Sequence, residues 1–382
     1  MIKTLPAEPI AIRSVEAFVF RYPVRTPVRT SFGIMRDRPA VFVRITDGEG
    51  AVGWGEVWCN FPACGAEHRA ALVLSVLAPL LEGKRFEGGP AQAFDKATAQ
   101  TAVLAIQSGE PGPLAQSIAG IDLALWDLCA RRAGQPLWRY LGGANGHIPV
   151  YASGINPDDP AAIALAQRAA GHLAFKLKIG FDADRDVLNV QALRHALGDD
   201  APLMVDANQA WSLEEACGMA ERLDGFGLGW LEEPLRADRP WHEWQALRSR
   251  SSIPLAAGEN LAGLDAFDEA MQSQALSVVQ PDAAKWGGIS GNWSVIARLF
   301  DAGLRFCPHY LGAGIGLSAS GHLLAAAGGG GLLEIDSNPN PLRTDLCPAL
   351  GRIEDGFIEL GESPGIGVEP NLERLAQSIR SG

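Results

Sequence analysis

Two short segments, Pro202-Leu-Met-Val-Asp-Ala-Asn208 and Trp230-Leu-Glu-Glu-Pro234, decide how the second half of this sequence folds. Each is a run of mostly apolar residues that ends in acidic side chains, and the residues between them have helical spacing. A buried strand followed by a helix is the repeating unit of an α/β protein. The two segments therefore predict parallel strands whose acidic side chains share one edge of a sheet.

The same unit recurs from His147 to the segment around Leu332, which gives eight expected strands. The spacing of their ends ranges from 30 residues, between Lys176 and Asp206, to 23 residues, between Glu259 and Asp282. A steady βα period of this kind predicts a (β/α) barrel, whose chemistry gathers at the carboxyl ends of the strands. From the second strand onward, every strand ends in an ionisable residue: Lys176, Asp206, Glu232, Glu259, Asp282, His309 and Glu334.

The first 145 residues have a different character. Residues 15–57 are β-like, with the turn Asp47-Gly-Glu-Gly50, and residues 65–143 are helical, most clearly between Ser117 and Arg132. These patterns predict an α+β domain over residues 1–145 and a barrel domain over residues 146–345.

Composition excludes several classes of protein. The chain has 382 residues, 47% hydrophobic and 20% charged, and a net charge of -12, which argues against nucleic acid or an anionic membrane as a partner. The sequence pattern predicts neither a signal peptide nor a membrane span, and the six cysteines form no CxxC pair. We expect a cytoplasmic enzyme.

Asp206, Glu232 and Glu259 end three adjacent expected strands, so their carboxylates should converge. Three like charges require a cation, and an all-oxygen ligand set suits Mg²⁺ better than Zn²⁺. Glu233 and Asn260 are expected to support these ligands from the rim.

Two bases are expected on either side of this metal. Lys176 and Lys178 lie two residues apart, so they face the same side of one strand, either the barrel interior or a solvated edge. Inside the barrel, burial and the repulsion among the two ammonium groups and a divalent metal would lower a lysine pKa enough to make it a base. Across the barrel mouth, Asp282 is placed to orient His309 as a second base.

Glu334 has two possible roles, as a protonated hydrogen-bond donor to a substrate carboxylate or as the ion-pair partner of a lysine. A divalent cation between two different bases suits removal of a proton from the carbon next to a carboxylate, because the metal and hydrogen-bond donors can neutralise the resulting enediolate.

These motifs resemble the enolase superfamily, specifically its mandelate racemase subgroup, over nearly the whole chain. The matching stretches are Lys176-Leu-Lys178, Val205-Asp-Ala-Asn208, Glu232-Glu-Pro, Gly258-Glu-Asn, Gln280-Pro-Asp282-Ala-Ala-Lys-Trp-Gly-Gly, Pro308-His309 and Leu333-Glu334. The resemblance implies a modified (β/α)7β TIM-like barrel and an N-terminal capping domain, with residues 346–382 packing on that cap. It also implies a homo-oligomer that acts on a small carboxylate.

By resemblance, Lys178 is one acid/base, Lys176 its neighbour and a carboxylate contact, and the Asp282–His309 dyad the opposite acid/base. Glu334 becomes the electrophilic donor, and Asn208 a contact for the substrate's α-substituent. Substrate specificity is expected from two cap loops, over residues 27–38 and 58–65.

Several alternatives stay open at this point. The reaction is either dehydration of a sugar acid or racemisation or epimerisation of an α-substituted carboxylate, because both can use the two opposed bases. A non-catalytic metal-binding barrel is a more distant alternative. The glycine-rich stretch Leu311-Gly-Ala-Gly-Ile-Gly-Leu317, longer than expected for mandelate racemase itself, is either a tight turn or a phosphate cradle. Aromatic residues Trp58, Trp286 and Tyr310 are either packing or a cage for a cation.

Overall fold

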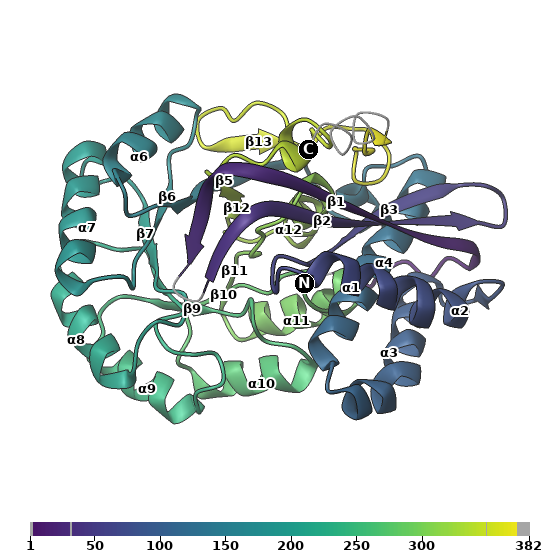
Figure 1. Ribbon diagram of the computed structural model, residues 1–382, viewed down its shortest axis with the longest axis horizontal. Helices are drawn as coiled ribbons and strands as arrows, with labels where there is room; N and C mark the ends of the chain where they lie inside the picture. The colour runs from purple at the N-terminus through teal and green to yellow at the C-terminus, as the bar shows by residue number, and fades with distance from the viewer. Residues whose placement is uncertain (1–2, 31–32, 349, 373–382) are drawn as a thin grey trace.

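The computed structural model describes residues 3–30, 33–348 and 350–372 of the chain. An N-terminal cap domain lies beside a larger barrel of strands and helices (Figure 1). The cap has a four-stranded sheet in the order β3-β2-β1-β4 and a set of helices that pack against it. Its elements are β1 (Ile10–Thr30), β2 (Gly33–Asp47), β3 (Val52–Val57), the helices α1 (Gly65–Leu72), the π-helical η1 (Val73–Leu77) and α2 (Ala78–Leu81), β4 (Arg85–Phe86), and the helices α3 (Gly89–Ser108), α4 (Pro111–Arg132) and α5 (Leu137–Tyr140).

The first expected specificity loop is not a loop over most of its length. Strands β1 and β2 pair antiparallel almost to their tip, with Val28 opposite Met35 and Thr30 opposite Gly33. Residues 27–30 and 33–38 therefore form a two-stranded ribbon, and residues 31–32 lie outside the described part of the chain. Backbone pairing explains the difference, because each strand satisfies the polar groups of the other.

Eight parallel strands form the barrel, in the order β11-β10-β9-β8-β7-β6-β5-β12. They are β5 (His147–Ile155), β6 (Phe175–Lys178), β7 (Leu203–Asp206), β8 (Leu231–Glu232), β9 (Leu255–Ala257), β10 (Val278–Val279), β11 (Arg305–Phe306) and β12 (Leu333–Asp336). The helices between them are α6 (Pro160–Ala169), α7 (Ala183–Leu197), α8 (Leu213–Leu223), α9 (Trp241–Arg250), α10 (Leu264–Ser273), α11 (Gly288–Asp301) and α12 (Gly314–Ala327), and α13 (Pro341–Thr344) follows β12. The predicted TIM-like barrel and its antiparallel cap are confirmed.

Alternation along the strands separates two cores. Inward-facing side chains fill the barrel below its mouth, including Tyr151, Met204, Trp230 and Val278. The other face of the strands packs against the surrounding helices in the main core. The next inward-facing positions, closer to the carboxyl ends of the strands, are occupied by ionisable residues.

The chain after α13 returns to both domains. Strand β13 (Phe357–Glu359) pairs antiparallel with the start of β5. Gly365 exchanges backbone hydrogen bonds with Gln135 and Leu137 next to cap helix α5, at 2.9 and 2.7 Å. The segment therefore links cap and barrel, while the expected boundaries at residues 145 and 345 stay a prediction.

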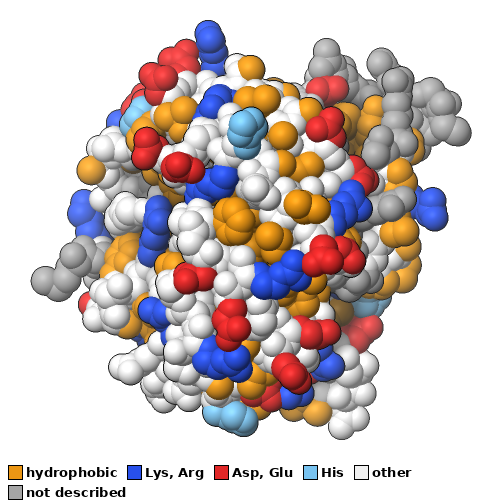
Figure 2. Space-filling view, turned by 90° about the vertical axis from the view of Figure 1, so that its left-hand side faces the viewer, with side chains coloured by type: hydrophobic (Ala, Val, Ile, Leu, Met, Phe, Trp, Pro, Cys, Tyr) orange, Lys and Arg blue, Asp and Glu red, His pale blue; other side chains and the backbone are white. Residues whose placement is uncertain are grey.

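The outer face of the barrel over α6 to α9 carries interspersed acidic and basic side chains (Figure 2). Ion pairs join neighbouring helices there, such as Arg222 with Asp184 at 2.7 Å and Arg250 with Glu221 at 2.8 Å. Among the described residues on this face, basic side chains alternate with acidic ones and form no continuous patch (Figure 2). None of the helices in the described ranges combines the length and hydropathy needed to cross a membrane.

Candidate active site

Strand register brings three of the predicted site residues together. Lys178 lies opposite Asp206 on the next strand, and Asp206 lies opposite Glu232 on the one after. Met204 and Trp230, two positions earlier, face the barrel interior, so Asp206 and Glu232 face it too. The local strand pattern therefore places charged side chains at the barrel mouth, next to an apolar layer in the barrel interior.

Both predicted lysines are in the barrel and hold these carboxylates. Lys176 is fully buried, and its Nζ lies 2.5 Å from Glu232 Oε1, 2.8 Å from Glu334 Oε1 and 3.8 Å from Asp206 Oδ2. Lys178 donates a hydrogen bond to Asp206 Oδ2. The solvated-edge alternative is therefore wrong for this strand.

The side chains alone shift the lysine pKa values upward, so a lowered lysine pKa with a divalent metal in place stays a prediction. Burial is the largest single influence and acts to lower the pKa of Lys178, but the Asp206 and Glu232 carboxylates together raise it. The pKa of Lys176 is also raised, because Glu232 and Glu334 outweigh its burial. The prediction of a lowered pKa assumed a divalent cation between the carboxylates, whose charge would oppose the ammonium groups.

The predicted dyad forms on the other side of the mouth. His309 Nδ1 lies 2.7 Å from Asp282 Oδ2, and both side chains are buried. His309 Nε2 lies 2.7 Å from Glu259 Oε2. Burial would lower the pKa of His309, but Glu259 and then Glu334 outweigh it, so the pKa is raised well above its usual range.

Glu334 lies between Lys176 and His309. It accepts hydrogen bonds from Ser153 Oγ at 2.5 Å and from the Tyr310 backbone N–H at 2.9 Å, besides its contact with Lys176. Burial would raise its pKa, but Lys176 and then His309 lower it to about 2. Of the two expected roles, the lysine ion pair is the one present in this arrangement.

The remaining predicted residues also lie at the mouth. Asn208 donates through its backbone N–H to Asp206 Oδ1 at 2.8 Å and has a buried side chain. Asn260 Nδ2 lies 2.8 Å from Glu233 Oε1 and 3.1 Å from Glu259 Oε1. Glu233 and Asn260 thus lie beside the acidic cluster, and their support of metal ligands stays a prediction.

The charges of the side chains at the barrel mouth show whether a divalent metal fits there. Six carboxylates face three lysines and one histidine, so even a protonated histidine leaves the cluster two positive charges short. Burial accordingly raises the pKa of Glu232 to about 7 and that of Glu233 to about 8. A divalent cation supplies the missing charge, so Asp206, Glu232 and Glu259 are a suitable ligand set. The six carboxylates are those of Asp206, Glu232, Glu233, Glu259, Asp282 and Glu334, and the cations are Lys176, Lys178, Lys285 and His309.

Within the described residues, no group of three or more His, Cys, Asp or Glu side chains is arranged to hold a metal ion. The ion pairs above explain this, because Lys176 lies between Asp206 and Glu232, while Lys285 and His309 hold Glu259. The three-carboxylate metal centre therefore stays a prediction.

Sequence reasoning missed Lys285 as a site residue. Its Nζ lies 3.0 Å from Glu259 Oε1, and it faces the Trp58 ring at 4.7 Å from the ring centroid. The signal was present, since Lys285 follows Asp282 by three residues in a stretch already singled out. Gln280 in the same stretch donates to Glu232 Oε2 at 2.7 Å and was also missed.

Of the two alternatives for the aromatic residues, packing within the chain is the one present. The ring of Trp58 faces Lys285, Trp286 packs against Phe267 with ring centroids 5.6 Å apart, and Tyr310 is buried next to Glu56. Each aromatic residue is therefore already partnered within the chain.

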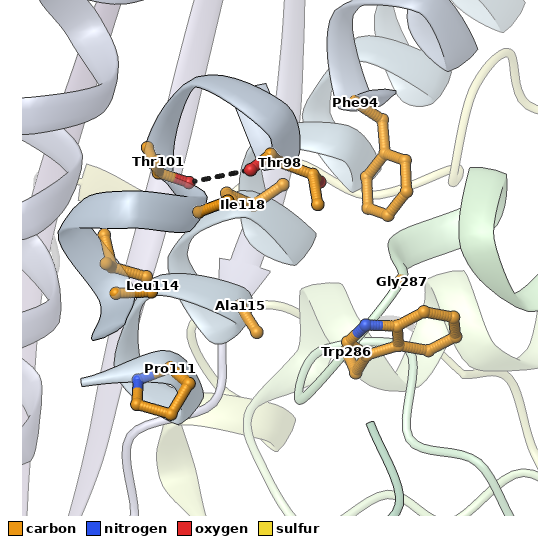
Figure 3. Close-up of a pocket in the computed structure, with 11 residues that line it drawn as sticks. Phe94, Thr98, Thr101, Pro111, Leu114, Ala115, Ile118, Trp286 and Gly287 are labelled. Carbon is orange, nitrogen blue, oxygen red and sulfur yellow. Dashed lines mark hydrogen bonds between the residues drawn. The ribbon is translucent and has the colours of Figure 1, made fainter. Parts of the chain in front are cut away.

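A cavity of about 130 Å³ lies next to the loop that follows β10, but it is a different kind of site (Figure 3). Apolar side chains of α3 and α4 line it, together with Trp286 and two threonines, of which Thr101 donates to the Thr98 carbonyl at 3.4 Å. None of its lining residues is ionisable. It therefore offers no acid/base chemistry.

The fold and the residues at the barrel mouth define a class of enzyme, and the comparisons with known proteins give the family. Residues 161–375 match the enolase C-terminal domain-like family, and residues 14–142 match the mandelate racemase/muconate lactonizing enzyme N-terminal domain. The chain belongs to the mandelate racemase/muconate lactonizing enzyme family of the enolase superfamily and is an enzyme of that superfamily.

Individual relatives span almost the whole chain. A mandelate racemase/muconate lactonizing enzyme from Bordetella bronchiseptica RB50 is 57% identical and covers 97% of this chain and 99% of its own, with a TM-score of 0.92. A racemase from Streptomyces coelicolor A3(2) with bound magnesium is 30% identical over 96% and 99% of the two chains, with a TM-score of 0.84. The 3,6-anhydro-alpha-L-galactonate cycloisomerase of Streptomyces coelicolor is 32% identical over 96% and 99%. More distant relatives include dehydratases and racemases.

Proposed function

We propose that this protein is a Mg²⁺-dependent enzyme that removes the α-proton of a small carboxylate substrate to form an enediolate, and that the reaction is dehydration of a sugar acid. The observation that carries this proposal is the position of the two bases. Lys178 is on β6 and His309 follows β11, with four strands of the barrel between them. Two different proton-transfer groups therefore face one site from opposite sides.

The charged groups around that site suggest how a substrate would be held. Lys176 and Glu334 would contact the substrate carboxylate, and Asn208 its α-substituent. A magnesium ion held by Asp206, Glu232 and Glu259 would supply electrostatic stabilisation of the negative charge that develops on the carboxylate. The magnesium in the related Streptomyces racemase supports this choice of metal.

Loss of a β-hydroxyl follows naturally from this arrangement. One base removes the α-proton, and the opposite group, once protonated, donates a proton to the departing hydroxyl. A relative from Saccharolobus solfataricus, 29% identical over 86% of this chain and 87% of its own length, is named arabinonate dehydratase, which supports a sugar acid as the substrate.

Racemisation or epimerisation is the second candidate, because it needs the same pair of opposed groups. In this case one group removes the α-proton and the other returns a proton to the opposite face. A relative from Bacillus cereus, named N-succinyl-L-Arg/Lys racemase, favours keeping this candidate.

The test is proton exchange in D₂O with MgCl₂ and a library of sugar acids and other α-substituted carboxylates, followed by mass spectrometry. Loss of water supports dehydration, while deuterium at the α-carbon without loss of water supports racemisation or epimerisation. We expect Lys178→Ala and His309→Asn each to abolish exchange on one face of the substrate. Full activity in the double variant would contradict the two-base proposal.

A further inference from the structure

Two buried carboxylates of the cap reach into the barrel. Glu56, in strand β3, accepts hydrogen bonds from the backbone N–H groups of Ala313 at 2.6 Å and Gly316 at 2.8 Å. Asp122, in helix α4, accepts from the backbone N–H groups of Ile289 at 2.7 Å and Ser290 at 3.0 Å. Each cap carboxylate therefore binds the first turn of a barrel helix, where backbone donors lack partners within the helix.

These two helices follow the loops that carry the dyad. Helix α11 begins six residues after Asp282, and α12 begins five residues after His309. Glu56 therefore holds the chain just after His309, while Asp122 holds the chain just after Asp282. The loop after Asp282 is a turn in which the Ala284 backbone N–H donates to Asp282 Oδ1 at 2.8 Å, whereas residues 307–313 after β11 form no helix or strand. Contacts with the cap therefore add to local bonds in the first loop and have few local bonds beside them in the second.

The cap segment from Glu56 to Asn60 makes further contacts with the same two loops. The Asn60 side chain donates to the Leu311 carbonyl, and the Trp58 backbone N–H donates to the Ala284 carbonyl at 3.3 Å. Leu311 lies two residues after His309, and Ala284 lies two residues after Asp282. One short cap segment thus contacts both sides of the dyad.

Glycines make room for the two carboxylates. A Cβ atom on Gly288, whose φ is +53°, would lie 2.2 Å from Asp122 Oδ2. A Cβ atom on Gly312 would lie 2.8 Å from Glu56 Oε1 and 2.3 Å from the Tyr310 hydroxyl oxygen. The glycine-rich stretch is therefore the end of the loop and the first turn of α12, and its N–H donors bind a carboxylate of the chain itself.

We propose that Glu56 and Asp122 are positioning residues that hold Asp282 and His309 at hydrogen-bonding distance, so that docking of the cap completes the second acid/base group. This inference rests on the proposed function of His309. Burying a carboxylate away from water is costly unless hydrogen bonds compensate for it. Glu56 and Asp122 are only 2% and 1% exposed, and backbone N–H groups of the barrel supply those hydrogen bonds.

The test compares Glu56→Gln and Asp122→Asn with a matched control, Asp127→Asn. Asp127 is also a buried cap carboxylate with two backbone donors, but these are Trp54 at 2.8 Å and Ile366 at 2.7 Å, outside both dyad loops. Proteins labelled with ¹⁵N-histidine are compared by NMR in buffer containing MgCl₂. The His309 ring signals are assigned from their loss in His309→Asn.

We expect the His309 ring signals to shift in Glu56→Gln and Asp122→Asn and to stay at their wild-type positions in Asp127→Asn. Exchange of the α-proton on the His309 face should fall roughly 10- to 100-fold in the first two variants, as for a small misplacement of a reacting group. Exchange on the Lys178 face should stay within about twofold, since its loops are not the ones held.

Unchanged His309 signals in both variants would overturn the inference, as would equal shifts in the Asp127 control. If Glu56→Gln does not fold, Asn60→Ala removes a single contact to the same loop and should shift the same signals by less. If the wild-type protein exchanges no α-proton, the proposed function fails, but the NMR comparison still decides whether the cap positions His309.

Discussion

The buried ion pair between Arg38 and Asp336 joins the cap to the last barrel strand, and its removal should destabilise the protein unequally from its two sides. Arg38 Nη2 lies 2.6 Å from Asp336 Oδ2, and the two side chains are 3% and 2% exposed. Arg343 Nη1 lies 3.8 Å from the same oxygen. One carboxylate therefore faces two guanidinium groups.

The structure sets the order of the two substitutions. Removing one partner of a buried ion pair costs about 3 to 5 kcal/mol. Arg38→Met should lie at the lower end, about 3 kcal/mol, because Asp336 keeps Arg343 nearby and two hydrogen bonds from Asn338, at 2.7 and 3.0 Å. Asp336→Asn should lie at the upper end, about 5 kcal/mol, because it leaves Arg38 buried and charged, with Met35 sulfur at 3.9 Å as its other contact and Nε without a hydrogen-bond partner.

Urea unfolding followed by tryptophan fluorescence measures both effects, and the double variant gives the coupling between the residues. We expect the double variant to lose about 2 kcal/mol less than the sum of the single losses, within the range of contacting pairs. An Asp336→Asn variant as stable as Arg38→Met would refute the charge argument. Losses that simply add would show that the two residues do not interact.

Three further predictions concern the metal, acid stability and the glycine-rich turn. MgCl₂ at 100 times its dissociation constant should stabilise the wild type by about 2.7 kcal/mol, and calorimetry should show weaker binding in Glu232→Gln; equal binding would exclude Glu232 as a ligand. Burial lowers the pKa of His322 to about 3, so neutral His322 contributes folding stability that is present above pH 6.5 and is lost as the pH falls toward 3, at about 1.4 kcal/mol per pH unit. Between pH 6.5 and 4.5 the free energy of unfolding of the wild type should therefore fall by roughly 2 to 3 kcal/mol more than that of His322→Gln. Parallel stability curves for the two proteins would contradict this. Gly312→Ala should destabilise the protein by about 1 to 3 kcal/mol, because its Cβ would lie 2.3 Å from the Tyr310 hydroxyl oxygen. Gly218 lies in helix α8, and a Cβ added there would meet no neighbouring side chain or strand within 4 Å. Gly218→Ala should therefore stabilise the protein by up to about 1 kcal/mol.

The barrel could be predicted because its signal is local and repeated. Each strand is a short apolar run, and in segments such as Phe175–Lys178 and Leu203–Asp206 the last residue is the functional one. Strict alternation then predicts which side chains face inward, and Lys178 lies opposite Asp206 on the neighbouring strand. No knowledge of the cap is needed for this step.

Contacts between domains could not be predicted in the same way. Glu56 and Ala313 are 257 residues apart in the chain, and nothing in the local pattern of either shows that they meet. Asp122 lies on a helix that was recognised from its spacing, but its partners are on α11. Residues 27–30 and 33–38 form a ribbon where the sequence predicts a loop, because their pairing also depends on a partner strand.

The raised pKa values of Lys176 and Lys178 show which charges neutralise the carboxylates of the site. The lysine residues were expected to repel a metal ion, yet in the described arrangement Lys176 and Lys178 take over the role of cations among the carboxylates. Each lysine–carboxylate contact that neutralises Asp206 or Glu232 competes with a metal at that oxygen. If Lys178 is the proposed base, a cation bound at Asp206 would have to take the place of its ammonium group, and metal binding would then be coupled to the ability of this lysine to accept a proton.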